Sequence, residues 1–285
     1  MKDKIRIGVT KGLGDAIFMT PAIRAIRRMK PESRIIIYYT RDYHRDVFIN
    51  NPNVDSIRRM GMGDNVINRC LAKGIRFSNY GRFYPNSCYD ITAAQMIAEE
   101  LGVRLEGGKT ELFLSPDESR EGKARVAALS RPLIGIQTTA AWSANKNWPV
   151  ERWAELVNQN KRATFVQVGL KNDHPAPGTM DFRGIGLRRT FAVIGACDAF
   201  VGVDSGLAHA ACALNVVSLV VCGPTSPTVI SDPRSRILYS ARPCSPCIEV
   251  LVGDRCPYGL ACMQDITANR VSSELREMLG SNCAD

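Results

Sequence analysis

Asp15 stands in a glycine turn, KGLGDAIF, that starts at Lys11 directly after a short apolar run. Gly12 and Gly14 leave the backbone of this turn open to close approach by another group. A carboxylate at the end of a buried strand can take a proton from a hydroxyl group as that hydroxyl attacks a carbon centre, which is general base catalysis. It can equally cap the helix that follows, and the residues alone favour this structural role.

The most informative stretch is AFVGVDSGLAHAACALNVVSLVVCGPTSP, at residues 199–227, which predicts strand, turn, helix, strand and turn. Asp204 ends the first strand, and Ser205 and Gly206 open the helix. The free N–H groups and the positive dipole end of a helix N-terminus suit a diphosphate, and Gly206 would let that ligand approach the backbone. An ordinary turn capped by Asp204 and Ser205 is the structural alternative. His209 lies one turn into the helix, where a lone histidine is more often a packed residue.

A second polar group follows the apolar strand LIGIQ. Thr138 and Thr139 supply two hydroxyls at the strand end, and Lys146 supplies a positive charge in the loop that follows. Two hydroxyls and an ammonium group can bind a phosphate. The indoles of Trp142 and Trp148 would either shield such a site from water or simply anchor the loop to the core.

Other signatures of nucleotide binding are weak. Asp173 closes a turn after a further apolar strand, where an acidic residue can contact a ribose hydroxyl, but the pattern favours a solvated turn. The chain has no Walker A sequence, and no G-x-G-x-x-G follows the first strand. These absences argue against an NTPase and against a simple dehydrogenase.

Ten cysteines, with a charged and strand-like start (MKDKIRIGVT) in place of a signal peptide, indicate thiols rather than a disulfide scaffold. Four cysteines have the spacing C-x2-C-x8-C-x5-C: Cys244, Cys247, Cys256 and Cys262. Four thiolates can wrap one tetrahedral metal, with zinc as the generic expectation and iron as a second choice. Reduced structural cysteines or a labile disulfide are the alternatives. A catalytic thiol is disfavoured because no histidine is local.

Charge and hydropathy limit the partners and the location. The net charge is +9: residues 1–130 hold 22 Lys and Arg against 15 Asp and Glu, whereas residues 131–285 hold 15 against 13. A basic excess favours anionic partners such as phosphorylated small molecules, nucleic acid or an anionic glycolipid. No apolar run reaches the roughly 18–20 residues that span a bilayer. We expect a cytoplasmic protein that is able to work at a membrane surface. Its oligomeric state is not predicted.

Strands and helices alternate around these groups, which predicts parallel sheets. Strands are expected at residues 5–9, 34–39, 54–58, 111–114, 133–137, 164–168, 199–203 and 216–221. Helices are expected up to Met29 (starting or kinking at Pro21) and at residues 91–101, 119–129, 150–158, 191–196 and 205–214. Arg131-Pro132 marks the boundary between two Rossmann-like halves, 1–130 and 131–285. Ligands of such sheets bind at the carboxyl ends of the strands.

Four blocks together resemble the bacterial heptosyltransferases of glycosyltransferase family nine. They are GLGDAIFMTPAIRAIRR, TTAAWSANKNWP, VGVDSGLAHAACAL with CGPTSP, and the closing cysteine segment with CMQDI. The blocks follow the family order over nearly the whole chain, except between Met60 and Asp90. The resemblance implies a GT-B fold of class α/β: two Rossmann-like domains with the active site in the cleft between them. The N-terminal half would hold the acceptor and the C-terminal half the nucleotide-sugar.

The resemblance also implies roles for the residues named above. Asp15 would be the base that activates the acceptor hydroxyl. The donor diphosphate and its sugar would be bound by Thr138, Thr139, Lys146, Asp204, Ser205, Gly206, Leu207 and His209, with Asp204 on hydroxyls of the sugar. Lys11, Arg58 and Arg59 are candidates for acceptor contact from their charge and position. No catalytic metal is expected, because GT-B enzymes typically stabilise the leaving group without one.

The four clustered cysteines have counterparts in one branch of the family. The autotransporter heptosyltransferases carry a similar iron-binding motif, which implies a structural metal and a protein acceptor instead of lipopolysaccharide. The leading hypothesis is an inverting glycosyltransferase that uses ADP-heptose or a similar donor. One alternative is a nucleotide-sugar epimerase or phosphorylase on the same fold. The other is a basic module that is cross-linked by a metal and binds nucleic acid, although we do not expect a nucleic-acid partner.

Overall fold

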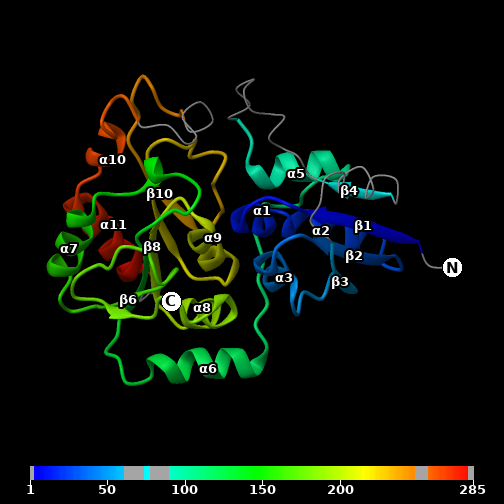
Figure 1. Cartoon of the computed structure of the whole chain (residues 1–285), viewed down its shortest axis with the longest axis horizontal. Helices are drawn as coiled ribbons and strands as arrows, with labels where there is room; N and C mark the ends of the chain where they lie inside the picture. The colour runs from blue at the N-terminus through cyan, green and yellow to red at the C-terminus, as the bar shows by residue number, and fades with distance from the viewer. Residues whose placement is uncertain (1–2, 61–73, 78–89, 248–255, 282–285) are drawn as a thin grey trace.

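The chain forms two lobes, each built on its own parallel sheet (Figure 1). The computed structural model describes residues 3–60, 74–77, 90–247 and 256–281. The stretch between Met60 and Asp90, where the family resemblance lapses, lies mostly outside the described residues. No helix within the described ranges is long and apolar enough to cross a membrane.

The first lobe has a four-stranded sheet in the order β3-β2-β1-β4. Its strands are β1 (Lys4–Val9), β2 (Arg34–Tyr39), β3 (Ser56–Arg59) and β4 (Ile75–Phe77). Its helices are α1 (Leu13–Phe18), α2 (Thr20–Met29), α3 (Asp42–Phe48) and α5 (Ala93–Leu101). The helical segment expected up to Met29 is broken at Met19, and Pro21 stands in the first turn of α2, where its missing N–H costs nothing.

The second lobe has a six-stranded sheet in the order β10-β9-β8-β5-β6-β7. Its strands are β5 (Leu133–Gln137), β6 (Thr164–Gln167), β7 (Met180–Asp181), β8 (Ala199–Val203), β9 (Ser218–Cys222) and β10 (Ser235–Tyr239). Its helices are α7 (Val150–Gln159), α8 (Leu187–Ile194), α9 (Gly206–Ala213), α10 (Ala261–Gln264) and α11 (Ala268–Ser281), with a short 3-10 turn at Ala144–Lys146. β5, β8 and β9 are buried throughout, which explains their nearly continuous apolar sequences.

Parallel pairing brings the predicted polar groups to common edges. In the first sheet Val9 pairs with Tyr39, and Tyr39 with Arg59, so the turn after β1 and the end of β3 share one edge. In the second sheet Gln137 pairs with Gly202, so the loops that follow β5 and β8 also leave the same edge. The sheets themselves therefore position the residues picked out in the sequence.

Helix α6 (Pro116–Val126) connects the lobes in sequence but packs on the second one. Its Gly122 lies directly against Ala192 of α8, where a side chain would not fit. Figure 1 shows α6 running beneath the second lobe. The strand expected at residues 111–114 is wrong: this segment has no strand partner, although Leu112 donates one backbone hydrogen bond to Ala213, 3.0 Å long.

Arg188 of α8 ties the two lobes and their connection together. Its Nε donates to Glu118 of α6 over 2.7 Å, and its other two nitrogens donate to the carbonyls of Asp46 in α3 and Phe113, each over 2.8 Å. The guanidinium holds the pKa of Glu118 down to about 2. A planar fork of donors suits this task because one side chain reaches three acceptors at once.

Candidate active site

The Asp15 turn is held from inside and from α3. Gly12 precedes α1, and its N–H donates to Asp15 Oδ2 over 2.6 Å, so Asp15 caps its own helix as the structural alternative predicts. The carbonyl of Lys11 accepts a hydrogen bond from His44 Nε2 (2.6 Å) and one from the Tyr43 hydroxyl (3.1 Å). No pattern in the sequence predicts these two hydrogen bonds, because α3 is a short and largely polar helix.

The electrostatic surroundings of the Asp15 carboxylate suit a second role besides helix capping. Burial raises its pKa, and the Gly12 N–H and electrostatic interactions with Lys11, Lys146 and His209 oppose that shift. Lys146 and His209 belong to the second lobe, so the carboxylate of the first lobe lies within the electrostatic reach of the predicted donor site. A raised pKa brings a carboxylate closer to the working range of a general base.

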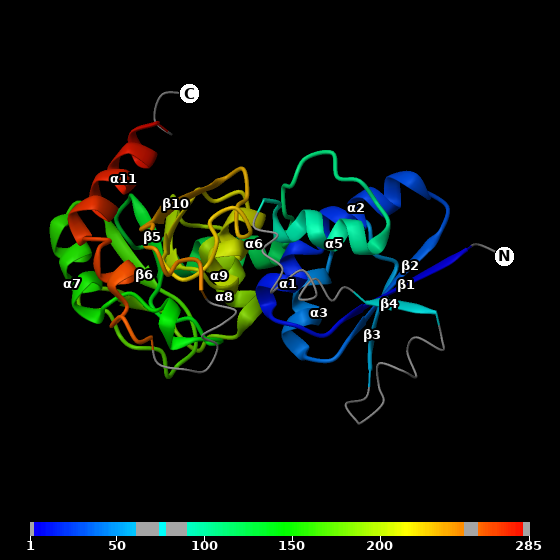
Figure 2. The same ribbon diagram turned by 90° about the horizontal axis from the view of Figure 1, so that it is seen from above.

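The two lobes touch at this turn, which Figures 1 and 2 both show as α1 lying beside α9. The ring of Phe18 lies 4.5 Å from that of His209, measured between centroids. A β-carbon on Gly14 would lie 3.0 Å from His209 Cδ2, and one on Gly206 would lie 2.8 Å from the side chain of Leu13. The face of Gly206 predicted to admit a ligand is therefore occupied by Leu13, and glycine is needed there for contact between the lobes.

Asp204 is the centre of a buried polar cluster. Its side chain is within the protein (Asp204 is 4% exposed), and its Oδ2 lies 2.6 Å from Lys146 Nζ and accepts the Thr225 hydroxyl over 2.8 Å. Its Oδ1 lies 3.2 Å from His209 Nε2. Burial alone would raise the pKa of Asp204, but the Lys146 charge and the His209 contact hold it well below its usual range. Asp204 is thus an ionised anchor that fixes Lys146 and His209.

Thr225 was missed as a candidate, although the sequence contains a signal for it. It lies in the turn GPTSP directly after the buried strand β9, at the same edge as Asp204. Ser205, the residue before α9, donates its hydroxyl to Gln137 Oε1 at the end of β5. The polar ends of three neighbouring strands are therefore joined by hydrogen bonds.

The two threonines after β5 have different surroundings. Thr138 is buried; its hydroxyl donates to the carbonyl of His174 over 2.8 Å and accepts from Gln167 Nε2 over 3.1 Å. Thr139 is half-buried, and its hydroxyl lies 3.3 Å from that of Thr138. Of the two, Thr139 is better placed to reach a ligand.

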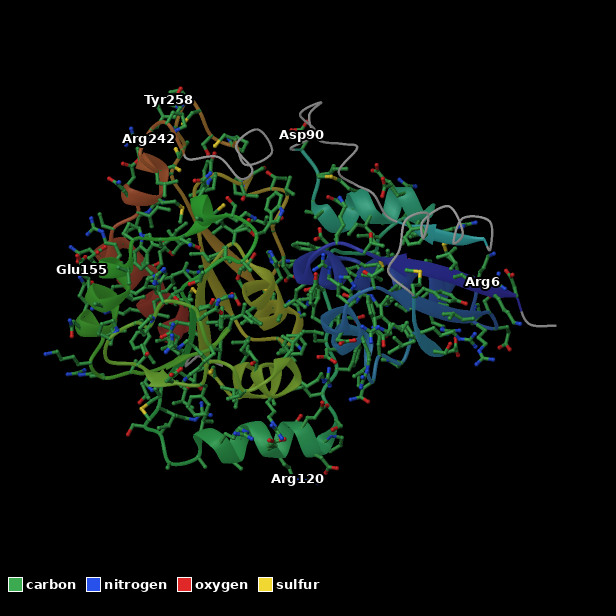
Figure 3. The ribbon with its side chains drawn as sticks, in the orientation of Figure 1. Arg6, Asp90, Arg120, Glu155, Arg242 and Tyr258 are labelled. Atoms are coloured by element: carbon green, nitrogen blue, oxygen red, sulfur yellow. The ribbon has the colours of Figure 1, made fainter. Side chains whose placement is uncertain are left out.

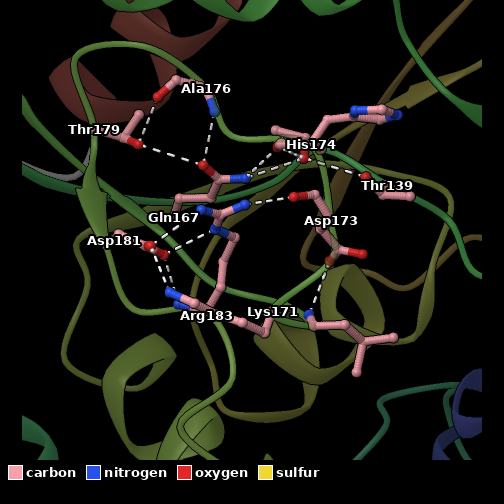
Figure 4. A network of polar contacts seen from close by, with 11 residues as sticks. Thr139, Gln167, Lys171, Asp173, His174, Ala176, Thr179, Asp181 and Arg183 are labelled. Atoms are coloured by element: carbon pink, nitrogen blue, oxygen red, sulfur yellow. Dashed lines mark hydrogen bonds and ion pairs between the residues drawn. The ribbon is translucent and has the colours of Figure 1, made fainter.

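Figure 4 shows the loop after β6, where the sequence favoured a solvated turn. That expectation is wrong for Asp173, which is 7% exposed and whose Oδ2 accepts from the Leu170 N–H over 2.9 Å. Arg183 reaches the Asp173 carbonyl and pairs with Asp181, with Nε and Oδ1 2.8 Å apart. The loop is braced by its own side chains.

The three candidates for acceptor contact lie at one edge of the first sheet. Lys11 is half-buried beside the Asp15 turn, and Arg58 and Arg59 are exposed at the end of β3. Arg59 lies 3.9 Å from the Asp42 carboxylate, a loose pair on the surface. Because successive side chains of a strand point to opposite faces of the sheet, Arg58 and Arg59 leave this edge on opposite sides.

The tryptophans of the loop after β5 divide into two kinds. Trp148 is 3% exposed, donates its N–H to the carbonyl of Ile266 over 2.8 Å and packs edge-on against Trp153. It anchors the loop, as the structural alternative predicts. Both rings line a cavity of about 260 Å³ together with Thr138 and His174. Trp142, in contrast, is 60% exposed.

The four clustered cysteines line one small cavity together with Asn145 and Pro224. Cys262 lies where a β-carbon on Gly223 would be 2.7 Å from its sulfur, and the N–H of Cys247 donates to the carbonyl of Pro224 over 2.8 Å. None of these four cysteines forms a disulfide, and burial raises the pKa of Cys262. Tyr258, which also lines the cavity, is labelled at the top of the second lobe in Figure 3. Within the described residues, no three His, Cys, Asp or Glu side chains are arranged to hold a metal ion.

The protein has two lobes, each with its own parallel sheet, and the lobes meet where α1 contacts α9. This arrangement is that of the GT-B class of glycosyltransferase folds. The structure of ADP-heptose LPS heptosyltransferase II from Escherichia coli superposes with a TM-score of 0.74, over 100% of both chains at 20% identity. The iron-containing dodecameric glycosyltransferase TibC from enterotoxigenic E. coli H10407 gives 0.77, over 100% of this chain and 81% of its own at 17% identity. These likenesses show the fold.

The chain belongs to glycosyltransferase family 9 (heptosyltransferase), whose sequence profile matches residues 91–176 and 184–252, more than half of the chain. Among curated relatives, lipopolysaccharide heptosyltransferase 2 of Salmonella typhimurium is 32% identical over 165 residues, which cover 52% of this chain and 47% of that protein. The corresponding enzyme of E. coli K12 is 31% identical over the same shares. The matches thus span about half the length of these relatives.

Proposed function

We propose that this chain is an inverting glycosyltransferase that moves heptose from ADP-heptose to a hydroxyl of its acceptor. Two observations together support the proposal: Lys146 and His209 of the second lobe lower the pKa of the first-lobe Asp15 against the effect of burial, and Phe18 of α1 contacts His209 of α9 with 4.5 Å between ring centroids. A proton acceptor and a cationic group on opposite walls are what a displacement with a diphosphate leaving group requires. Membership of a heptosyltransferase family supports the choice of sugar.

In the proposed mechanism Asp15 takes the proton of the acceptor hydroxyl as the oxygen attacks the anomeric carbon. Lys146, held by Asp204 2.6 Å away, neutralises charge that develops on the departing diphosphate. The N–H groups of Ser205, Gly206 and Leu207 at the start of α9 and the hydroxyl of Thr139 add donors for the same oxygens. Removing one such preorganised donor typically costs roughly 3–4 kcal/mol of transition-state stabilisation.

For the acceptor we propose an anionic glycolipid core of the lipopolysaccharide type, or a protein hydroxyl. The first lobe, residues 1–130, carries most of the net positive charge, and Lys11, Arg58 and Arg59 lie at the edge that holds the Asp15 turn. We assign nucleotide-sugar binding to residues 131–285, noting that α6 packs with that lobe. Reaction with a nucleotide donor and the free thiols of the described cysteines favour the cytoplasm.

A metal at the cysteine cluster, zinc or iron, is proposed as structural only. The donor set suits a soft tetrahedral ion, because Cys244, Cys247, Cys256 and Cys262 surround one cavity. Their arrangement in the structure is not that of a finished site, so no step of the reaction is assigned to a metal. When bound, such an ion would cross-link the loop and support the adjacent turn at Pro224.

The experiment that tests the function incubates the purified chain with ADP-heptose and measures ADP release with and without a deacylated lipopolysaccharide core, and with a peptide rich in Ser and Thr. A glycosyltransferase releases ADP in step with a mass gain on one acceptor. Turnover of the donor with no acceptor would instead support an epimerase or a phosphorylase. Salt-sensitive binding of DNA or RNA that is indifferent to Asp15→Ala would support the nucleic-acid module.

A further inference from the structure

Trp142 is the exposed member of the three tryptophans of the chain. It is 60% exposed, whereas Trp148 and Trp153 are 3% and 0% exposed. Leaving an indole in water forgoes the favourable free energy of burying its apolar surface. A single exposed indole is not by itself a site, so its surroundings must decide whether it has a ligand.

The surroundings of Trp142 are those of the proposed donor site. Its ring lies in the loop after β5, and Lys146 Nζ lies over the ring, 5.0 Å from the centroid. The same ammonium group is 2.6 Å from Asp204 Oδ2, and its side chain is only 12% exposed. The field of Lys146 also reaches Asp15. Trp142 therefore stands beside the cation that would hold the diphosphate, with much of its surface open to solvent.

We infer that Trp142 is a stacking platform for the ring of the donor sugar, an inference that rests on the proposed function. A diphosphate bound at Lys146 brings the directly attached sugar within reach of the indole. The C–H groups of a pyranose ring are weakly positive, and the face of an indole is negative, so the two surfaces attract each other and exclude water. Trp142 would therefore recognise the sugar, whereas Lys146 recognises the diphosphate.

The competing occupant is the nucleobase, which also stacks on aromatic rings. The nucleobase is present in ADP and in ADP-heptose alike, whereas the sugar is present only in ADP-heptose. Comparing the two ligands therefore separates the two occupants without any structure of the complex.

The test measures the affinity of ADP and of ADP-heptose by calorimetry, with no acceptor present, for the wild type, Trp142→Ala, Trp142→Phe and a control. The control is Met29→Ala, which removes another exposed apolar side chain (63% exposed) at the end of α2. We expect Trp142→Ala to weaken ADP-heptose binding by about tenfold and to leave ADP binding unchanged. Trp142→Phe should retain most of the affinity, and Met29→Ala all of it.

Native fluorescence provides a second readout. Because the other two indoles are buried, quenching by acrylamide reports mainly on Trp142. ADP-heptose should protect the wild type from quenching and ADP should not, and Trp142→Phe should show little quenching with or without ligand.

Equal affinity of the wild type and Trp142→Ala for ADP-heptose would overturn the inference while leaving the proposed function in place. An equal loss for ADP and ADP-heptose would also overturn it, because the indole would then act on what both ligands share, the nucleobase or the diphosphate beside Lys146. If the wild type binds neither ligand, the proposed function fails and the inference fails with it. The three outcomes are distinguishable because the first two require a wild type that binds ADP-heptose.

Discussion

Leu13 of α1 fills the space in front of Gly206 at the start of α9, so that a β-carbon on Gly206 would lie 2.8 Å from three carbons of that side chain. The two residues belong to different lobes and to the two most characteristic motifs of the sequence. Together with the approach of His209 to Gly14, this contact explains why both motifs contain glycine, because a side chain at either position would collide with the other lobe.

Gly206→Ala should therefore weaken the contact between the lobes. The added carbon overlaps Leu13, and overpacking of this kind typically costs about 1–3 kcal/mol. The melting temperature should fall, and the radius of gyration from small-angle scattering should rise. Gly108→Ala is the matched control, because a β-carbon there meets nothing within 4 Å; equal behaviour of the two variants would show that the Leu13 contact is unimportant.

Asp15→Asn should abolish transfer without weakening ADP binding. Loss of a general base lowers the rate by roughly 10²- to 10⁴-fold, whereas the groups proposed to hold the diphosphate are untouched. Steady-state kinetics and calorimetry measure the two effects separately. Asp3→Asn, which changes an exposed carboxylate far from the turn, should behave as wild type. A variant with near-normal turnover would remove Asp15 from its role.

The same variant has an expected effect on stability. Burial raises the pKa of Asp15 above its ordinary value of 3.8, so the folded state binds this proton more tightly than the unfolded chain does. The ionised carboxylate therefore costs stability at neutral pH, and the cost fades as the pH falls below the raised pKa toward 3.8. Asp15→Asn should melt above the wild type at pH 8, with a difference that shrinks in acid. A constant difference across this range would contradict the assignment.

Lys146 and Asp204 should be strongly coupled. Removing one member of a buried ion pair leaves the other charge unpaired, at a cost of about 3–5 kcal/mol. Asp204→Asn and Lys146→Met should each lower the free energy of unfolding, and the double variant should lose much less than the sum. Lys146→Met should also weaken ADP binding. Denaturant titrations of the four proteins give the coupling energy; additive losses would mean that the pair is not formed in solution.

Thr225 should act through Asp204. Thr225→Val keeps the shape but removes the hydroxyl that donates to Asp204 Oδ2, which costs about 1.5–3 kcal/mol for a hydrogen bond to a charged group. Thr225→Ser keeps the hydroxyl and should recover most of the stability and the ADP affinity. Failure of the serine variant to rescue would assign Thr225 to packing alone.

The cysteine cluster should bind about one zinc or iron ion per chain. Elemental analysis of the purified protein measures the content, and a chelator should lower the melting temperature of the loaded form. Replacement of Cys244 and Cys247 by Ser should abolish metal binding, whereas replacement of the separate, buried Cys212 by Ser should not. Four freely titrating thiols and no metal would reject the site.

Much of the architecture could be predicted from the sequence because buried parallel strands are marked by their composition. β5 and β8 fall at their expected bounds. α3 was not foreseen, because it is short and largely polar. The fate of the loop tryptophans could not be predicted either: Trp142 and Trp148 are chemically alike, and only the carbonyl of Ile266 makes one of them an anchor.

The contacts of the candidate site divide in the same way. Asp204 was singled out at a strand end and Lys146 in the loop after a strand, whereas the functional roles predicted for Asp15 and His209 depended on the family resemblance. That Asp204 is buried among Lys146, His209 and Thr225 depends on which loops meet, and those loops are distant in sequence. The occupied face of Gly206 was missed for the same reason, because its neighbour comes from the other lobe.

The tilted contact between the rings of Phe18 and His209 has a further consequence for the timing of the proposed reaction. If the lobes move apart to admit a new donor molecule, that ring contact breaks and Asp15 moves away from Lys146 at the same time. The proposed base, Asp15, and the group proposed to stabilise the leaving diphosphate, Lys146, would then come together and separate at the same time. This coupling would protect the bound donor from hydrolysis until the acceptor binds.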